Sequence, residues 1–332
     1  MSLAKEDIVL RILKRNPSTL RKQGSAFAPS NIALCKYWGK RYDELNLPIT
    51  SSLSVSLGKL GSKVTINLRQ KSDLVELNGK RLARDSSFAR RVSAFLDLFR
   101  PDRKTFFKVV AVNTIPTAAG FASSASGFAA MTMALNQLFG WKLNGRDLSI
   151  LSRLGSGSAC RSVFTGFVEW RMGNRADGMD SHALPLKSRW PDLRMGLVVV
   201  SDKEKSIGSR PAMKRTVETS ALYRSWPAKV AKDLPRLKTA IRRRDFPMLG
   251  KVAESNALAM HATMFDAKPP VVYWLPESVT AMKKIWKLRE DGLNVYFTMD
   301  AGPNLKVLFL KKDTASVKRV FPKIQIVSPF AA

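Results

Sequence analysis

Residues 109–141 read VVAVNTIPTAAGFASSASGFAAMTMALNQLFGW, a stretch without a single Asp, Glu, Lys or Arg. An uncharged segment of this length raises the question of a membrane-spanning helix. Pro116 and the serines at 123, 124 and 126 argue against it, because they break the segment. The pattern instead predicts a strand over 106–114, a loop of small residues and a buried helix over 126–139. We therefore expect a soluble protein.

The loop between that strand and helix has the composition of an anion-binding turn. Small residues let backbone N–H groups approach a phosphate closely, serine hydroxyls add donors, and the helix N-terminus adds the positive end of its dipole. The loop lacks the GxxxxGK[ST] and GxGxxG patterns, so it is neither a Walker A loop nor a dinucleotide-binding turn. Tight packing alone also explains such a segment, so the phosphate interpretation depends on its context.

Outward from the loop, hydrophobic patterning divides the chain into three parts. Residues 1–24 are expected to form an N-terminal extension with helical spacing and no chemical role. Strand-like runs, among them 52–57 and 64–68, are followed by helices and predict a first domain over 25–190 that carries the phosphate loop. Residues 191–332 predict a second domain in which a strand, several helices and closing strands succeed one another. This order indicates an α+β fold.

Composition excludes several classes of site. The 332 residues are 45% hydrophobic and 25% charged, which is typical of a globular protein. His182 and His261 are the two histidines, so zinc sites built from clustered histidines are excluded. Cys35 and Cys160 are too few for a disulfide framework, and we expect a cytoplasmic protein. Any metal is expected to have oxygen ligands.

The formal net charge of +30 favours polyanionic partners such as nucleic acid, acidic lipid or phosphorylated metabolites. The basic residues are nevertheless dispersed, as at Lys203, Lys205 and 242–244, and no RNP, zinc-finger or helix-turn-helix pattern accompanies them. Most of them are expected to form a solvated basic surface. A nucleic-acid-binding protein is therefore the distant alternative.

Three further segments carry polar side chains suited to anions. Residues 155–162, GSGSACRS, contain Arg161, whose planar guanidinium suits a carboxylate or phosphate. Lys36 and Lys40 would share a face if their segment were helical, and a plain surface pair is the alternative. Asp300 precedes Gly-Pro at the end of a predicted strand, where a carboxylate is held rigidly, although turn capping is also common there.

Taken in order, these segments resemble the mevalonate diphosphate decarboxylases, a family of the GHMP kinase superfamily. The resemblance is carried by APSNIA (28–33), KYWGK (36–40), LNLP (45–48), SSLSVS (51–56), GFASSA (120–125), GSGSACRS (155–162) and MDAGPN (299–304). It implies a two-domain α+β GHMP kinase fold, with an N-terminal domain like ribosomal protein S5 domain 2, a GHMP-type C-terminal domain, and the active site in the cleft between them.

The implied reaction belongs to isoprenoid biosynthesis and uses ATP and Mg²⁺. The 3-hydroxyl of mevalonate 5-diphosphate is phosphorylated, and phosphate and carbon dioxide are then lost to give isopentenyl diphosphate. The resemblance further implies a homodimer that binds neither nucleic acid nor membrane. Alternatives are a related enzyme that acts on mevalonate monophosphate, and one that stops after 3-phosphorylation.

The same resemblance assigns residues to roles. Asp300 matches the catalytic aspartate that orients or deprotonates the 3-hydroxyl, Lys36 the lysine beside it, and Arg161 the arginine that holds the substrate carboxylate. Matched positions near the substrate are Tyr37, Lys40, Ser156, Gly157, Ser158, Ser209 and Arg210. Matched ATP-binding positions are Asn31, Gly120, Ser123 and Ser124, and Ser124 is also the candidate magnesium ligand. Asp180-Ser181 resembles a recurring pair, but a turn explains it equally well.

Overall fold

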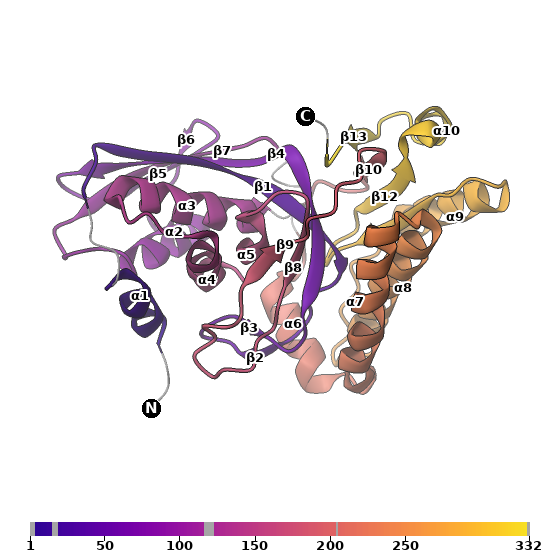
Figure 1. The fold of residues 1–332 in the computed structure, drawn as a ribbon, viewed down its shortest axis with the longest axis horizontal. Helices are drawn as coiled ribbons and strands as arrows, with labels where there is room; N and C mark the ends of the chain where they lie inside the picture. Colours follow the sequence, from indigo (N-terminus) through magenta and orange to yellow (C-terminus); the bar gives the residue numbers. More distant parts are fainter. Residues whose placement is uncertain (1–3, 15–18, 116–122, 204, 331–332) are drawn as a thin grey trace.

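The computed structural model describes residues 4–14, 19–115, 123–203 and 205–330 of the 332. Two sheets lie side by side, each with helices packed on it (Figure 1). In the described part of the chain no helix is both long and apolar enough to cross a bilayer.

The first sheet has seven strands in the order β6-β5-β7-β4-β8-β9, and β1 pairs along β4. Its strands are β1 (Gln23–Cys35), β4 (Ser52–Arg69), β5 (Leu74–Leu77), β6 (Lys80–Arg81), β7 (Phe106–Asn113), β8 (Phe167–Trp170) and β9 (Ala183–Pro185). A small ribbon follows β1, made of β2 (Lys40–Tyr42) and β3 (Leu47–Pro48). The runs 52–57 and 64–68, predicted as two strands, are parts of the single strand β4.

Helices cover one face of this sheet, as Figure 1 shows. They are α1 (Lys5–Leu13), α2 (Ser87–Asp97), α3 (Ser123–Phe139), α4 (Gly145–Gly155) and α5 (Ala159–Ser162). Helix α3 is apolar almost all round because it is buried between the sheet and the other helices. Its alanines let β1 approach closely: a Cβ at Gly24 would lie only 2.0 Å from the carbonyl oxygen of Ala134. The small residues of the quoted segment are thus needed for packing as well.

The second sheet has four strands in the order β11-β12-β10-β13, all antiparallel. Its strands are β10 (Leu193–Val198), β11 (Tyr296–Met299), β12 (Leu305–Leu310) and β13 (Gln325–Val327). Its helices are α6 (Ser209–Thr219), α7 (Trp226–Arg243), α8 (Phe246–Phe265), α9 (Pro276–Glu290) and α10 (Thr314–Val320), with short 3₁₀ turns η1 (Leu222–Ser225) and η2 (Lys311–Asp313). Arg244 takes a left-handed conformation between α7 and α8, and Asp245 caps α8 by accepting from the N–H of Met248.

One hydrophobic core joins the two halves. Ile32 and Leu34 of β1 belong to the same buried cluster as Trp226 of α7 and Leu249 of α8. Asn256 of α8 accepts a hydrogen bond from the backbone N–H of Lys36 at 2.8 Å. The end of β1 and the residues that follow it therefore lie between the two domains and contact helices of the second domain.

The segment 36–40 is not helical. Strand β1 ends at Cys35 and β2 begins at Lys40, so the condition under which Lys36 and Lys40 would share a helical face is not met. The N-terminal extension docks as a helix, with Ile8 completely buried and Val9 and Ile12 almost so.

Candidate active site

A cleft of about 500 Å³ lies where the two domains meet, and side chains from both domains line it. The sequence-predicted residues that line it are Asn31, Lys36, Tyr37, Lys40, Ser124, Ser156, Gly157, Ser158, Arg161, Ser209, Arg210 and Asp300. Gly120 and the side chain of Ser123 lie outside the described residues. Positions far apart in the chain thus meet in one cavity.

Asp300 follows β11 and reaches the cleft floor beside Lys36. The Lys36 ammonium donates to Asp300 Oδ1 at 2.8 Å and to the carbonyl of Ala33 at 2.8 Å. The Lys36 side chain is 2% exposed, whereas that of Asp300 is 28% exposed and so open to the cleft. The Asp300 carboxylate can therefore accept a hydrogen bond from a ligand in the cleft while it stays paired with Lys36.

Burial and neighbouring charges shift the pKa values of both Asp300 and Lys36. Burial acts to raise the pKa of Asp300, but the charges of Lys36 and then Lys306 outweigh it and hold that pKa far below its usual range. Burial lowers the pKa of Lys36 to about 8, although Asp300 acts in the opposite direction. Near neutral pH the carboxylate is therefore ionised and the lysine is close to its titration range.

Arg161 lies at the end of the short helix α5, where the chain turns after 155–158. Its Nε donates to Asn31 Oδ1 at 3.0 Å, and its Nη1 donates to the hydroxyl of Ser52. Asn31 in turn donates to Ser162 Oγ at 2.7 Å. Asn31, predicted as a supporting polar contact, therefore fixes the guanidinium of Arg161. Since Arg161 is only 3% exposed, its charge is directed at the cleft rather than at bulk water.

Tyr37 presents a buried hydroxyl with no hydrogen-bond partner among the described residues. Gly157 lies against it: a Cβ at that position would be 2.8 Å from the phenolic oxygen. Burial raises the pKa of Tyr37, so the phenol keeps its proton. Buried hydroxyls are seldom left unpaired, and this one faces a cavity that a ligand can fill.

Cations dominate the rest of the lining. Lys40 is paired with Asp43 at 3.1 Å, and Arg210 donates to the carbonyl of Gly155 at 2.7 Å. Ser124 stands in the first turn of α3, where the helix dipole favours anions. The arrangement suits a ligand that carries several negative charges.

Sequence reasoning missed three basic residues near the cleft: Arg91, Lys205 and Lys306. Arg91 and Lys205 line it, and Lys306 pairs with Asp300 at 3.2 Å. Lys205, cited above only as an example of the dispersed basic residues, is not part of a solvated surface: its ammonium donates to the carbonyl of Ala301, and burial lowers its pKa to about 8. Its position just before Ser209 and Arg210 was the available signal.

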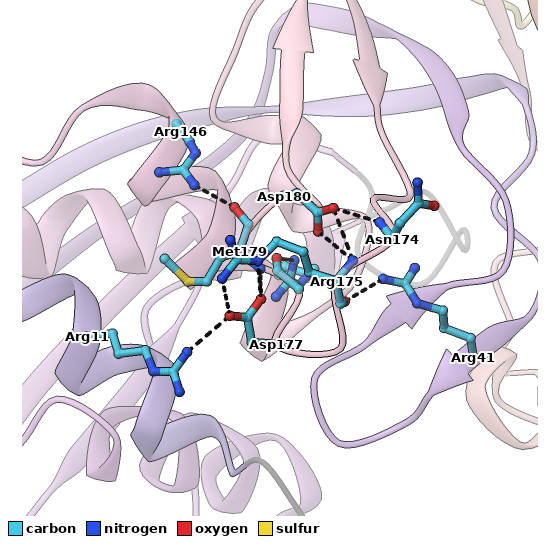
Figure 2. Close-up of polar contacts among 10 residues, drawn as sticks. Arg11, Arg41, Arg146, Asn174, Arg175, Asp177, Met179 and Asp180 are labelled. Atoms are coloured by element: carbon cyan, nitrogen blue, oxygen red, sulfur yellow. Dashed lines mark hydrogen bonds and ion pairs between the residues drawn. The ribbon is translucent and has the colours of Figure 1, made fainter.

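Asp180 and Ser181 do not line this cleft. Figure 2 shows the Asp180 carboxylate accepting from the backbone N–H groups of Asn174 and Arg175, at 2.7 and 3.1 Å. Ser181 accepts from the Trp170 indole at 3.1 Å. The turn explanation is therefore sufficient for this pair.

Two protein-family models match the chain. The model described as "Diphosphomevalonate decarboxylase-like N-terminal domain" matches residues 28–183, and "Mevalonate 5-diphosphate decarboxylase C-terminal domain" matches residues 196–329. The curated diphosphomevalonate decarboxylase of Homo sapiens is 39% identical over 315 residues, which cover 87% of this chain and 77% of the human protein. That of Debaryomyces hansenii is 37% identical over 320 residues, 90% of this chain and 82% of the relative.

Solved structures of similar proteins agree with the fold. The mevalonate diphosphate decarboxylase from Staphylococcus aureus has a TM-score of 0.88 at 37% identity, covering 94% of this chain and 96% of its own. The complex described as "MDDEF in complex with MVAPP, AMPPCP and Magnesium" has a TM-score of 0.86 at 41% identity, covering 93% and 97%. The predicted two-domain α+β GHMP kinase fold is confirmed by these likenesses. Since both domains match over nearly their whole length, the chain belongs to the diphosphomevalonate decarboxylase family.

Proposed function

We propose that this protein converts mevalonate 5-diphosphate and ATP into isopentenyl diphosphate, ADP, phosphate and carbon dioxide. The observation that carries the proposal is the meeting of Asp300, Lys36 and Arg161 in one cleft whose other charged side chains, among the described residues, are all basic. A substrate with a diphosphate at one end and a carboxylate at the other needs such a site.

In the first step, the Asp300 carboxylate accepts a hydrogen bond from the tertiary 3-hydroxyl and aims its oxygen at the γ-phosphorus. The new O–P bond forms as the bond to ADP breaks, and the hydroxyl proton leaves through Asp300. Because two lysines depress its pKa, Asp300 is a weak base and acts mainly by orientation. Positioning and charge stabilisation are the main contributions of a protein to phosphoryl transfer. Lys36 and Lys205 supply positive charge on this side of the cleft.

In the second step, the 3-phosphate departs with the electrons of its C–O bond. The electrons of the bond to the carboxylate then form the new double bond, and carbon dioxide leaves. We assign the substrate carboxylate to Arg161, whose guanidinium is fixed by Asn31 and Ser52. We assign the diphosphate to Tyr37, Lys40 and Arg210, with Ser156, Gly157, Ser158 and Ser209 around it.

The ATP phosphates are assigned to the N-terminus of α3, at Ser124. The similar structure in complex with AMPPCP and magnesium supports this class of ligand. Ser124, which lines the cleft in the first turn of α3, is the side chain that would hold Mg²⁺, and its hydroxyl oxygen is the type of ligand that this ion prefers. When bound there, Mg²⁺ neutralises phosphate charge. The ATP-binding roles of Gly120 and Ser123 stay predictions.

We also propose that the domain boundary lies near residue 190, which is supported by the gap between the two family matches and by the start of β10 at Leu193. The two buried free cysteines support a reducing compartment such as the cytoplasm. A homodimer stays a prediction, and sedimentation of the purified protein measures it.

The function is tested by incubating the protein with ATP and either mevalonate 5-diphosphate or the monophosphate. ADP, phosphate and carbon dioxide are measured separately. We expect equal amounts of the three products with the diphosphate and little turnover of the monophosphate. ADP without carbon dioxide would identify a kinase, and a preference for the monophosphate would support the other alternative. Arg161→Gln should lower carbon dioxide formation, whereas the exposed Arg171→Gln serves as the control.

A further inference from the structure

Asp300 is held by two lysines, one on each carboxylate oxygen. Lys36 contacts Oδ1 at 2.8 Å, and Lys306 contacts Oδ2 at 3.2 Å. Lys306 also donates to the carbonyl of Asn304 at 3.3 Å. Both lysine side chains are 2% exposed.

The location of Lys306 requires an explanation. It lies in β12, between β10 and β11 in the middle of the second sheet, and its neighbours Leu305 and Val307 are completely buried. An ammonium group in such a position is costly unless it is paired. An apolar residue would suit the strand better, so the lysine is explained by the carboxylate that it meets.

We propose that Lys306 is a positioning residue that fixes the orientation of the Asp300 carboxylate in the reaction above. This inference rests on the proposed function. A carboxylate with one ammonium partner can rotate about its last torsion, which is broad. A second partner on the other oxygen fixes the carboxylate plane, and the lone pairs that remain are left for the 3-hydroxyl. Such preorganisation lowers the barrier to in-line transfer.

The backbone of Asp300 is fixed as well. His261 of α8 lies with Nε2 at 3.1 Å from the Asp300 carbonyl oxygen, so this nitrogen carries the proton and donates it. Burial lowers the pKa of His261 to about 3, and the ring is therefore neutral. Asp300 is thus held from β12, from α8 and from the end of β1.

Ionisable groups face Asp300 and Lys306 from every element around them. They are Lys36 after β1, Arg161 of α5, Lys205 before α6, His261 of α8 and Asp300 itself after β11. Lys306 lowers the pKa of both Lys36 and Lys205 by repulsion, after the larger effect of burial. We therefore expect that removing its charge raises both pKa values and moves the basic limb of the pH profile to higher pH.

The test compares Lys306→Met with Lys306→Arg and with the exposed Lys312→Met as a matched control. For Lys306→Met we expect kcat to fall about 10- to 100-fold with little change in KM, as for a misplaced reacting group. The basic limb of kcat/KM should shift upward. Lys306→Arg should restore part of kcat and return the limb toward its wild-type position, because the positive charge is kept. Lys312→Met should match the wild type.

Binding of a non-hydrolysable ATP analogue shows that each variant is folded. If Lys306→Met does not bind it, Lys306→Gln replaces it in the same comparison, because it removes the charge and keeps a polar group. The inference is overturned if the neutral variant that folds has the kcat and basic limb of Lys312→Met. It is also overturned if kcat falls with no movement of the limb, since a merely structural role predicts that result. A wild-type protein without turnover would instead contradict the proposed function.

Discussion

At the scale of single residues, the charged side chains of described residues that line the cleft are one carboxylate and several lysines and arginines. Asp300 is its single carboxylate in the described part of the chain, whereas Lys36, Lys40, Arg91, Arg161, Lys205 and Arg210 bring positive charge to it. This imbalance favours ligands with several negative charges. It also keeps Asp300 ionised, so that the residue accepts a hydrogen bond rather than donating one.

Replacing Asp300 with Asn should lower kcat by about 10³-fold or more, because the amide presents an NH₂ group to the lysines and orients the hydroxyl poorly. Nucleotide binding should be largely kept, since we assign the ATP phosphates to the N-terminus of α3 and not to Asp300. Steady-state kinetics and titration with an ATP analogue measure the two effects. Asp192→Asn, on an exposed side chain, is the control. Near-normal turnover of the Asp300 variant would disprove the assigned role.

The pKa of Lys36, lowered by burial to about 8, predicts a basic limb in the pH profile. Lys36 is charged below that value and neutral above it, and the charged form is the one needed, so kcat/KM should fall as pH rises through about 8. Lys205, whose pKa burial also lowers to about 8, is the other candidate group. The limb should persist in Lys205→Met. A profile that stays flat up to pH about 10 would contradict the assignment to Lys36.

At the scale of elements, the N-terminal helix α1 is part of the first domain. Ile8 packs into the same buried cluster as Leu151 and Leu154 of α4. Arg11 pairs with Asp177 at 3.0 Å, and Asp177 also pairs with Arg175, as Figure 2 shows. The helix therefore ties the loop after β8 to the body of the domain, on the side away from the reacting groups.

Truncating Ile8 to Ala should destabilise the protein by about 2–4 kcal/mol, the usual cost of a large cavity in a core. Leu10 of the same helix is 61% exposed, and Leu10→Ala should change stability by less than about 0.5 kcal/mol. Denaturant midpoints of the two variants give the comparison. Equal midpoints would mean that α1 does not contribute its contacts in solution.

At the scale of the whole molecule, the net charge of +30 exceeds what one cleft needs. Helix α7 and the segment after β12 carry exposed basic residues that do not line the cleft, for example Lys232, Arg243 and Lys312. Their summed field still attracts anions toward the protein, because it extends over about a Debye length.

Salt should therefore weaken substrate capture more than chemistry. Between about 20 mM and about 200 mM KCl we expect kcat/KM for mevalonate 5-diphosphate to fall about tenfold, with kcat nearly constant. Sucrose at matched osmolarity should have no such effect. A salt-independent kcat/KM would show that the surface charge does not assist binding.

Local patterns were enough to predict the strand at 106–114 and most of helix α3, which begins at Ser123 rather than at 126. Motif order was enough to identify the family and to select Lys36, Arg161 and Asp300. These features depend on residues close together in the chain, or on the resemblance. The same local reasoning left the conformation of 36–40 open, and in the structure this segment is not helical and connects β1 to β2.

The sequence by itself thus determined the two-domain α+β architecture and selected Lys36, Arg161 and Asp300 as the candidate reacting side chains. The tertiary structure alone decided that Lys205 faces the cleft, that His261 holds the Asp300 backbone and that Lys306 reaches the second oxygen of Asp300. Lys306 is the one charged residue of β12, and its sequence neighbours do not show which group it pairs with. The physical reason is that burial and charge pairing depend on distances in space, which residue spacing does not encode.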